Sequence, residues 1–332
     1  MTSKDKILIG LVDADLLNGG TRHPNLVLLK LAGFLTDNAI PFRLIIDKDE
    51  NIMEYTTIYM SKVFSFTPDP PFYEKVKKTP NENKFKIGGT GDYAIKKDIK
   101  DFKSSRTRDM NQLENDIFLN NYPNKRGGKK KWGIDMCRQM PYYHLYDEYI
   151  QSKIKAGRKK SYFNDYLYYS IGFLTRGCIR HCPFCVNKLE NKVYRYSELE
   201  WFLDDERNEK GDLIRPYIYL WDDNFLAAPK EIWQPMLQSL IDSKRPFQFR
   251  QGLDERILAE SEDGEEIAQM LSKCKYHGDF IFAFDNWRDR DKIIKALKIW
   301  KRHNSKRGTK FYLFCGYTLK SGEDEKLYND IK

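Results

Sequence analysis

Three cysteines stand close together in the stretch RGCIRHCPFCVNK, which spans Arg176–Lys188. Cys178, Cys182 and Cys185 have the spacing C-x3-C-x2-C, while the other cysteines are scattered along the chain at Cys137, Cys274 and Cys315. Cysteine thiolates are ligands of zinc and of iron–sulfur clusters. Three cysteines that were merely buried in the core would not be expected to stand at such short, regular spacings. The spacing therefore predicts a metal or cluster site.

Two kinds of site compete for these thiols. Zinc prefers four tetrahedral ligands, and His181 could join the three cysteines, but no second C-x2-C or H-x3-H pair occurs elsewhere in the chain. A 4Fe–4S cluster usually takes four thiolates, so three leave one iron open to an outside ligand. The pattern favours the cluster, with zinc as the alternative.

The segment GFLTRGCIRHCPFC resembles the signature of the radical S-adenosylmethionine (SAM) enzymes. The resemblance implies that the three thiolates hold a 4Fe–4S cluster, that the open iron binds the amine and carboxylate of SAM, and that Phe184 packs near the adenine. It further implies that one electron cleaves SAM to methionine and a 5′-deoxyadenosyl radical, which abstracts hydrogen from the substrate. An electron donor such as flavodoxin or ferredoxin is implied as a partner.

In the second half of the chain, polar residues also follow three strands that the sequence predicts after the cysteine motif. They are Asp222, Asp223 and Asn224; Arg250 and Gln251; and Asp285 and Asn286. In α/β barrels the carboxyl ends of the strands build the active site. The resemblance implies SAM contacts for the first group, because LWDDNFLA stands where many members have a glycine-rich stretch. It implies contacts with the SAM carboxylate or the substrate for the second group, and with the ribose or the substrate for the third.

The second half of the chain alternates strand and helix patterns. The predicted strands are short apolar and aromatic runs: YLYYSIGFLTRGC, PYIYLWDD, PFQFRQG, GDFIFAFDN and KFYLFCGY. Helical patterns separate them, and one of these, SELEWFLDDE, begins with a capping box of Ser197 and Glu200. This repeat predicts an α/β fold with a parallel sheet, arranged as a partial (β/α) TIM-type barrel of about five to six strands.

The first half predicts a small parallel, Rossmann-like sheet. Its strands are expected in KILIGLV, PFRLIID, TTIYMSKVFSF and FKIGGTG, with a helix in HPNLVLLKLAGFLTDN. This order resembles the cobalamin-binding domain that precedes the barrel in one radical SAM subgroup, which makes cobalamin a candidate cofactor. The D-x-H-x-x-G motif is absent, but members of that subgroup also bind cobalamin without a histidine ligand.

Three segments are expected: a Rossmann-like, cobalamin-binding-like domain over 1–100, a basic linker or elaboration over 101–165, and a radical SAM partial barrel over 166–332. The net charge is +9, and the basic residues are densest in Lys125–Lys131 and Lys153–Lys160. Such runs are usually solvated loops, and a polyanion such as RNA or DNA is the sharper interpretation. With no signal peptide and no long apolar run, the chain is expected to be cytoplasmic, without a membrane partner.

The sequence thus predicts a radical SAM enzyme of unknown substrate. Methyl or methylthio transfer and nucleic-acid modification are the reaction classes that the resemblance suggests. The competing hypothesis is a non-catalytic iron–sulfur or zinc protein that senses redox state or binds nucleic acid. Only the first hypothesis predicts that SAM binds at the cysteine site.

Overall fold

The computed structural model describes residues 7–89, 134–182, 185, 187, 191–304 and 307–313. The chain divides into two compact units, Met1–Tyr168 and Tyr169–Lys332. The predicted boundary at residue 100, the basic run Lys125–Lys131 and the side chain of Phe184 lie outside the described residues. Each unit is described by itself below.

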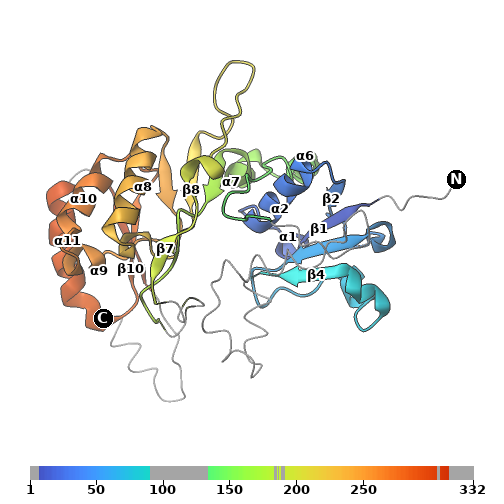
Figure 1. Cartoon of the computed structure of the whole chain (residues 1–332), viewed down its shortest axis with the longest axis horizontal. Helices are drawn as coiled ribbons and strands as arrows, with labels where there is room; N and C mark the ends of the chain where they lie inside the picture. Colours follow the sequence, from blue (N-terminus) through green and yellow to red (C-terminus); the bar gives the residue numbers. More distant parts are fainter. Residues whose placement is uncertain are drawn as a thin grey trace, which may run out of the picture. The chain divides into compact units, whose positions relative to one another are not determined.

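Unit 1 is built on a four-stranded parallel sheet (Figure 1). Its strands are β1 (Ile9–Asp13), β2 (Phe42–Leu44), β3 (Thr57–Ser61) and β4 (Phe85–Gly88), in the spatial order β2-β1-β3-β4. All five residues of β1 and of β3 are buried, as expected for central strands of a parallel sheet. The order reverses at β1, so the carboxyl ends of β1 and β3 form the switch point of the sheet.

The helices of unit 1 are short except for one. They are α1 (Ala14–Gly19), α2 (Leu26–Asp37), α3 (Pro71–Glu74), α6 (Asp147–Lys155) and α7 (Asn164–Leu167), with 3-10 turns at Ile52–Glu54, Pro80–Lys84 and Lys160–Phe163. The predicted helix after His23 is α2, and its N-cap Asn25 accepts a hydrogen bond from the Leu28 amide. Buried leucines of α2 share one core with Ile9 and Leu11 of β1.

Residues 134–168 contribute to the hydrophobic core that α2 and β1 form in unit 1. Ile134, Tyr146, Tyr149 and Phe163 are buried in the same cluster as the leucines of α2. The sequence analysis assigned most of this stretch to a linker because lysines and tyrosines interrupt its period. The tyrosines supply large apolar rings without a regular pattern, and the lysines lie on the exposed side.

The described residues of unit 2 form five parallel strands that follow one another in chain order. They are β5 (Tyr169–Gly172), β8 (Tyr217–Leu220), β9 (Phe247–Phe249), β10 (Phe280–Phe284) and β11 (Thr309–Leu313). Hydrogen bonding joins β5-β8-β9 and, separately, β10-β11. Two parallel bridges, Phe247 with Tyr276 and Leu253 with Phe282, connect the two groups. The predicted parallel sheet is confirmed; closure into a barrel is not seen in the described part of the chain.

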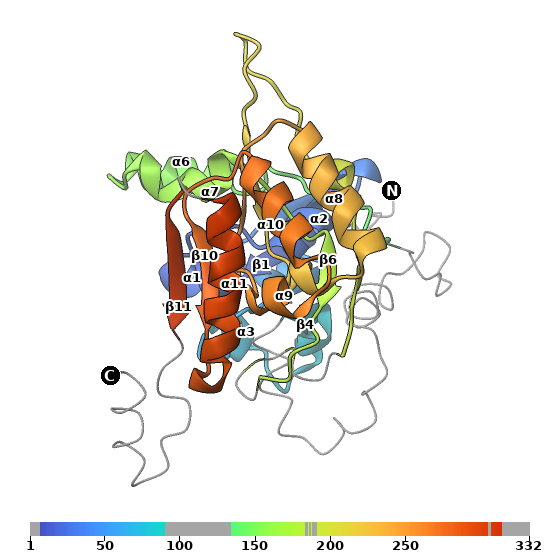
Figure 2. The same ribbon diagram turned by 90° about the vertical axis from the view of Figure 1, so that its left-hand side faces the viewer.

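The helices of unit 2 are α8 (Lys230–Asp242), α9 (Arg256–Glu260), α10 (Gly264–Lys273) and α11 (Arg290–His303). Figure 2 shows α8, α10 and α11 side by side, and α10 contacts both neighbours. Alternate strand residues face these helices and form one core with them, including Leu220, Phe249, Phe282, Trp233 and Trp300. The strand–helix–strand repeat therefore positions the carboxyl ends of the strands together on one edge.

The chain between β5 and β8 departs from the prediction of a helix. β6 (Thr175–Gly177) and β7 (Val193–Arg195) form an antiparallel pair, and SELEWFLDDE contributes only the 3-10 turn Leu199–Trp201. The predicted capping box does not form, because Glu198 takes the N-cap position and makes no side-chain cap bond. Asp204 and Asp205 are instead bound by the buried guanidiniums of Arg215 and Arg245.

Within the described ranges, no helix combines the length and apolar character that a membrane span requires.

Candidate functional site at the carboxyl ends of the second sheet

The cysteine loop begins at Gly177, the last residue of β6. Its φ is 90°, in the left-handed region, and a Cβ at this position would collide with the carbonyl oxygen of Lys192 on the paired strand. Only glycine adopts this conformation without strain. The backbone therefore turns sharply at Gly177 and directs the following residue, Cys178, away from the β6–β7 pair.

Backbone amides of the loop donate to its sulfur atoms. The Arg180 amide lies 3.3 Å from Sγ of Cys178, and the Asn187 amide lies 3.4 Å from Sγ of Cys185. All three thiols of the motif are partly exposed. Burial raises the pKa of the Cys182 thiol; the Arg256 guanidinium acts against this, while the Cys178 and Cys185 thiols add to it. The three thiols are thus close enough to affect one another's ionisation.

Asp222 anchors the start of this loop from the end of β8. Its fully buried carboxylate accepts from the amides of Leu174 (3.2 Å) and Thr175 (2.6 Å) and from the Thr175 hydroxyl (2.7 Å). Burial raises the pKa of Asp222 to about 7 despite these donors. The geometry makes Asp222 a structural acceptor, because its oxygens already face the loop.

Asp223 holds the cysteine loop from both sides. It accepts from the Gly177 amide at 2.9 Å and from Nδ2 of Asn187 at 2.8 Å, which lie before and after the three cysteines. The Arg176 guanidinium is 3.7 Å away. One carboxylate thereby fixes the two ends of the segment that carries the thiols.

Asn224 reaches a cysteine directly. Its Nδ2 lies 3.4 Å from Sγ of Cys178 and 3.1 Å from a carboxylate oxygen of Asp254. The side chain is buried, and within the described structure its Oδ1 has no hydrogen-bond partner. A buried acceptor beside a thiol is a position at which a ligand N–H would be bound.

The other residues predicted for the site are placed differently. Asp285 is half-buried, and its charge affects the ionisation of Cys182. Asn286 is exposed and caps the turn Trp287–Asp289 by accepting from the Arg288 amide. Gln251 lies in an exposed turn after β9. Asp285 is thus near the cysteine loop, while the side chains of Asn286 and Gln251 have no described contact with it.

Arg250 belongs to the face of the sheet opposite the helices. Its guanidinium lies 4.9 Å from the ring centroid of Tyr219, which in turn stacks on Tyr169 at 3.6 Å. Gln248 pairs with Tyr219 in register and is on the same face, and Tyr169 bonds to His277. This face is therefore aromatic and polar, in contrast to the apolar face under the helices.

Several charged residues around Asp254, the partner of Asn224, were not predicted for the site. Arg180 lies between the first two cysteines, and Asp254, Glu255 and Arg256 begin the connection after β9. Glu255 accepts from the Ala283 amide, and burial raises the pKa of Glu255 to about 7. The available signal was a charged triplet between the apolar residues Leu253 and Ile257, because buried charges need partners.

Thiolates are ligands of both iron–sulfur clusters and zinc, and the amide donors to sulfur fit either kind of site. In the described ranges, however, no set of three or more His, Cys, Asp or Glu side chains converges as a metal site. The described contacts of the sulfurs are the hydrogen bonds that Cys178 and Cys185 accept.

At the switch point of unit 1, the chain's own side chains fill the crevice. The Tyr146 hydroxyl donates to Asp13 at 2.9 Å and accepts from the Asn25 amide, and Asn25 in turn donates to Ser61 at 2.8 Å. All four residues are buried. These residues do not fit the nucleotide tail of a cofactor between the ends of β1 and β3.

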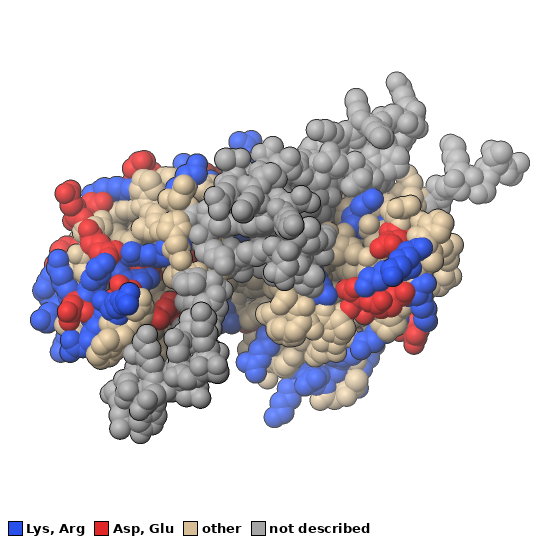
Figure 3. All heavy atoms as spheres, turned by 90° about the horizontal axis from the view of Figure 1, so that it is seen from below, with Lys and Arg blue, Asp and Glu red and all other residues tan. Residues whose placement is uncertain are grey.

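The charged surface is mixed. Figure 3 shows positive and negative side chains interspersed over the face it draws. In the basic run Lys153–Lys160, Arg158 lies over the ring of Tyr162 and Lys160 over that of Tyr168. These contacts are those of a solvated face, and the nucleic-acid partner remains a prediction.

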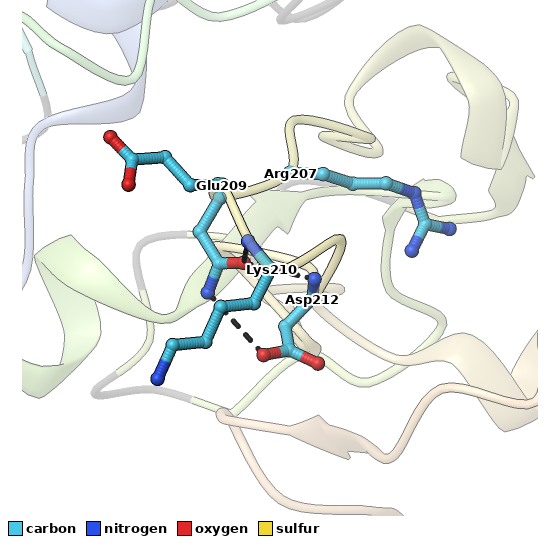
Figure 4. A pocket seen from close by; sticks show the side chains of 5 residues that line it. Arg207, Glu209, Lys210 and Asp212 are labelled. Atoms are coloured by element: carbon cyan, nitrogen blue, oxygen red, sulfur yellow. Dashed lines mark hydrogen bonds between the residues drawn. The ribbon is translucent and has the colours of Figure 1, made fainter.

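A pocket opens on the turn that precedes β8. It is lined by Arg207, Asn208, Glu209, Lys210 and Asp212, and Asn208 accepts the amides of Lys210 and Asp212 (Figure 4). The turn leads into the amino end of β8, whereas the cysteine loop is bound by residues after its carboxyl end. Because the strands are parallel, this pocket is at the amino ends of the strands, and the thiols are at their carboxyl ends.

Comparisons with known proteins agree with this fold. No protein-family model and no curated protein matches the chain. One solved structure, the cobalamin-dependent SAM radical enzyme OxsB with aqua-cobalamin and SAM bound, matches with a TM-score of 0.57 at 14% identity. The match covers 98% of this chain and 51% of that enzyme, so the chain spans about half its length. At this identity the similarity shows a common fold.

Proposed function

We propose that this chain is a radical SAM enzyme. The observation that carries the proposal is the C-x3-C-x2-C loop, held at the carboxyl ends of a parallel sheet by Asp222 and Asp223 after β8 and by Asp254 after β9. The fold similarity to a radical SAM enzyme supports it independently. We also infer that the five strands form part of a (β/α) barrel, because they pair in chain order and carry their helices on one face.

In this proposal Cys178, Cys182 and Cys185 hold a 4Fe–4S cluster. When bound, the cluster would supply one electron to SAM and thereby generate a 5′-deoxyadenosyl radical. Asn224 would act at both ends of its amide, donating to Cys178 and accepting from the amino group of SAM through its buried Oδ1. Asp285 and Phe184 remain candidates for SAM contact.

The face with Tyr219, Gln248 and Arg250 is proposed as the substrate side of the sheet. The stacked rings exclude water from one side of the Arg250 guanidinium, which strengthens its attraction for an anion or an electron-rich ring. Transfer of a methyl or methylthio group and modification of a nucleic acid are both compatible with such a surface. An external donor such as flavodoxin or ferredoxin would provide the electron.

Cobalamin is left out of the proposed reaction. The enzyme of similar fold was solved with cobalamin, but here Tyr146, Asp13, Asn25 and Ser61 occupy the crevice at the switch point of unit 1. A nucleotide tail entering there would have to displace a buried, hydrogen-bonded tyrosine. The proposed reaction therefore uses SAM without cobalamin.

Anaerobic reconstitution with iron and sulfide tests the proposal. We expect a reduced 4Fe–4S signal in electron paramagnetic resonance (EPR) that changes when SAM is added, together with formation of 5′-deoxyadenosine. Cys178→Ala should abolish cluster loading and product, whereas the matched control Cys137→Ala, outside the loop, should retain both. A zinc-filled site, or an iron site that does not respond to SAM, would favour the non-catalytic alternative.

A further inference from the structure

Asp254 lies where three segments of unit 2 meet. It follows Leu253, which bridges to β10, and only 8% of its side chain is exposed. One carboxylate oxygen accepts from Nε of Arg180 at 2.7 Å and from Nδ2 of Asn224 at 3.1 Å, and the other accepts from Nε of Arg256 at 2.6 Å. A single buried carboxylate thus joins the cysteine loop, the end of β8 and the start of α9.

Two of these contacts converge on the same thiol. Arg180 is the second residue after Cys178, and its own amide donates to Sγ of Cys178. Asn224 donates to the same sulfur from the opposite element, at 3.4 Å. Asp254 therefore reaches Cys178 through the backbone of the loop and through the side chain of Asn224. Any shift of this carboxylate changes both hydrogen bonds to that sulfur.

The charges around Asp254 keep it ionised. Burial alone would raise the pKa of Asp254, but the guanidiniums of Arg256 and Arg180 hold it below the ordinary value. Each arginine also has a second, more exposed carboxylate partner: Glu260 at 2.5 Å from Arg180, and Asp289 at 2.7 Å from Arg256. Glu260 and Asp289 bind the same arginines without contacting Asn224, which makes them suitable for comparison.

We propose that Asp254 is a positioning residue for the cysteine site. It fixes Arg180 and Asn224 relative to each other, so that the amide of Asn224 donates to Cys178 and its Oδ1 stays directed at the ligand. This inference rests on the proposed function and adds to it a residue that touches neither cluster nor SAM. A purely structural ion pair would stabilise the fold without affecting how the site responds to SAM.

The experiment compares Asp254→Asn with Glu260→Gln and Asp289→Asn in the full chain after anaerobic reconstitution. Asparagine has the same shape, but its NH2 group would face either Arg256 or the pair Arg180 and Asn224, all of which are donors. We expect Asp254→Asn to load iron but to need at least about tenfold more SAM for the EPR change, with a shifted midpoint potential of the cluster. The two controls should stay within about twofold of the unmodified protein.

Arg180→Ala provides a second test if Asp254→Asn does not fold. It removes the loop side of the contact and leaves Asp254 paired with Arg256, so we expect the same weakened SAM response. A normal SAM response in Arg180→Ala, or an equal effect of Asp254→Asn and both controls, would overturn the inference. An unmodified protein that loads no SAM-responsive cluster would instead refute the proposed function, so the two failures are distinguishable.

Discussion

The carboxylate of Asp222 gives the most direct test of how the cysteine loop is held. Three donors converge on it: the amides of Leu174 and Thr175 and the hydroxyl of Thr175. Asp222→Asn keeps the shape of the side chain but leaves only one acceptor oxygen. That oxygen can serve Thr175, and the new amide then faces the Leu174 N–H, donor against donor.

The expected cost follows from burial. Leu174 and Asp222 are both 1% exposed, so water cannot replace the lost acceptor. Leaving a buried donor unpaired costs about 1–3 kcal/mol, and hydrogen bonds to a charged group are worth about 1.5–3 kcal/mol each. We therefore expect the free energy of unfolding of unit 2 to fall by about 2–4 kcal/mol. Thr175→Val, which removes only the hydroxyl, should cost about 1 kcal/mol.

Urea unfolding of both variants and of the double variant measures these values. Both substitutions affect the hydrogen bond from the Thr175 hydroxyl to Asp222, so their effects should not add, with a coupling of about 0.5–3 kcal/mol. Iron and sulfide content after reconstitution should fall in Asp222→Asn, because the loop loses its anchor. An unchanged unfolding midpoint together with full iron content would refute the assignment of Asp222 as the anchor of the loop.

Two further predictions concern other parts of the fold. Gly172→Ala places a methyl group against the ring of Phe202, so we expect the free energy of unfolding to fall by about 1–3 kcal/mol. Adding Phe202→Leu should restore part of this loss. No recovery in the double variant would contradict the contact. Burial raises the pKa of Asp13 from 3.8 to about 6, so its contribution should lower stability as pH rises between these values, by roughly 3 kcal/mol. Asp13→Asn should remove that pH dependence, and an unchanged slope in urea unfolding between pH 4 and 7 would exclude Asp13 as its source.

Local patterns predicted much of the fold. The described parallel strands coincide with the predicted apolar runs, because buried parallel strands read as short continuous apolar stretches, whereas the antiparallel strand β7 lies in none of them. The spacing of the cysteines and the polar residues at strand ends also pointed to the edge of the sheet where the structure places the loop. SAM contact stays a prediction for Asp222 and Asp223; the structure shows that both accept hydrogen bonds from the segment around the cysteines, and no periodicity in the sequence indicated this second role.

The contacts that hold the site were beyond such patterns. Arg180 and Asp254 are separated by 74 positions, and each by itself reads as a surface charge. Their pairing becomes evident only when the third strand is placed beside the second. The tyrosines of residues 134–168 were missed for a related reason, since Tyr146 is buried through a hydrogen bond to Asp13, which is 133 positions away.

The pairing of unit 2 in chain order has a consequence for biosynthesis. After β5, each described parallel strand of unit 2 lies beside the parallel strand that precedes it in the chain, so the sheet can grow as the chain leaves the ribosome. The cysteine loop cannot mature on that schedule, because Asp222 and Asp254 are synthesised 47 and 74 positions after the loop residues that they bind. We expect cofactor insertion to follow translation of the third strand, which leaves the thiols open to oxidation until then.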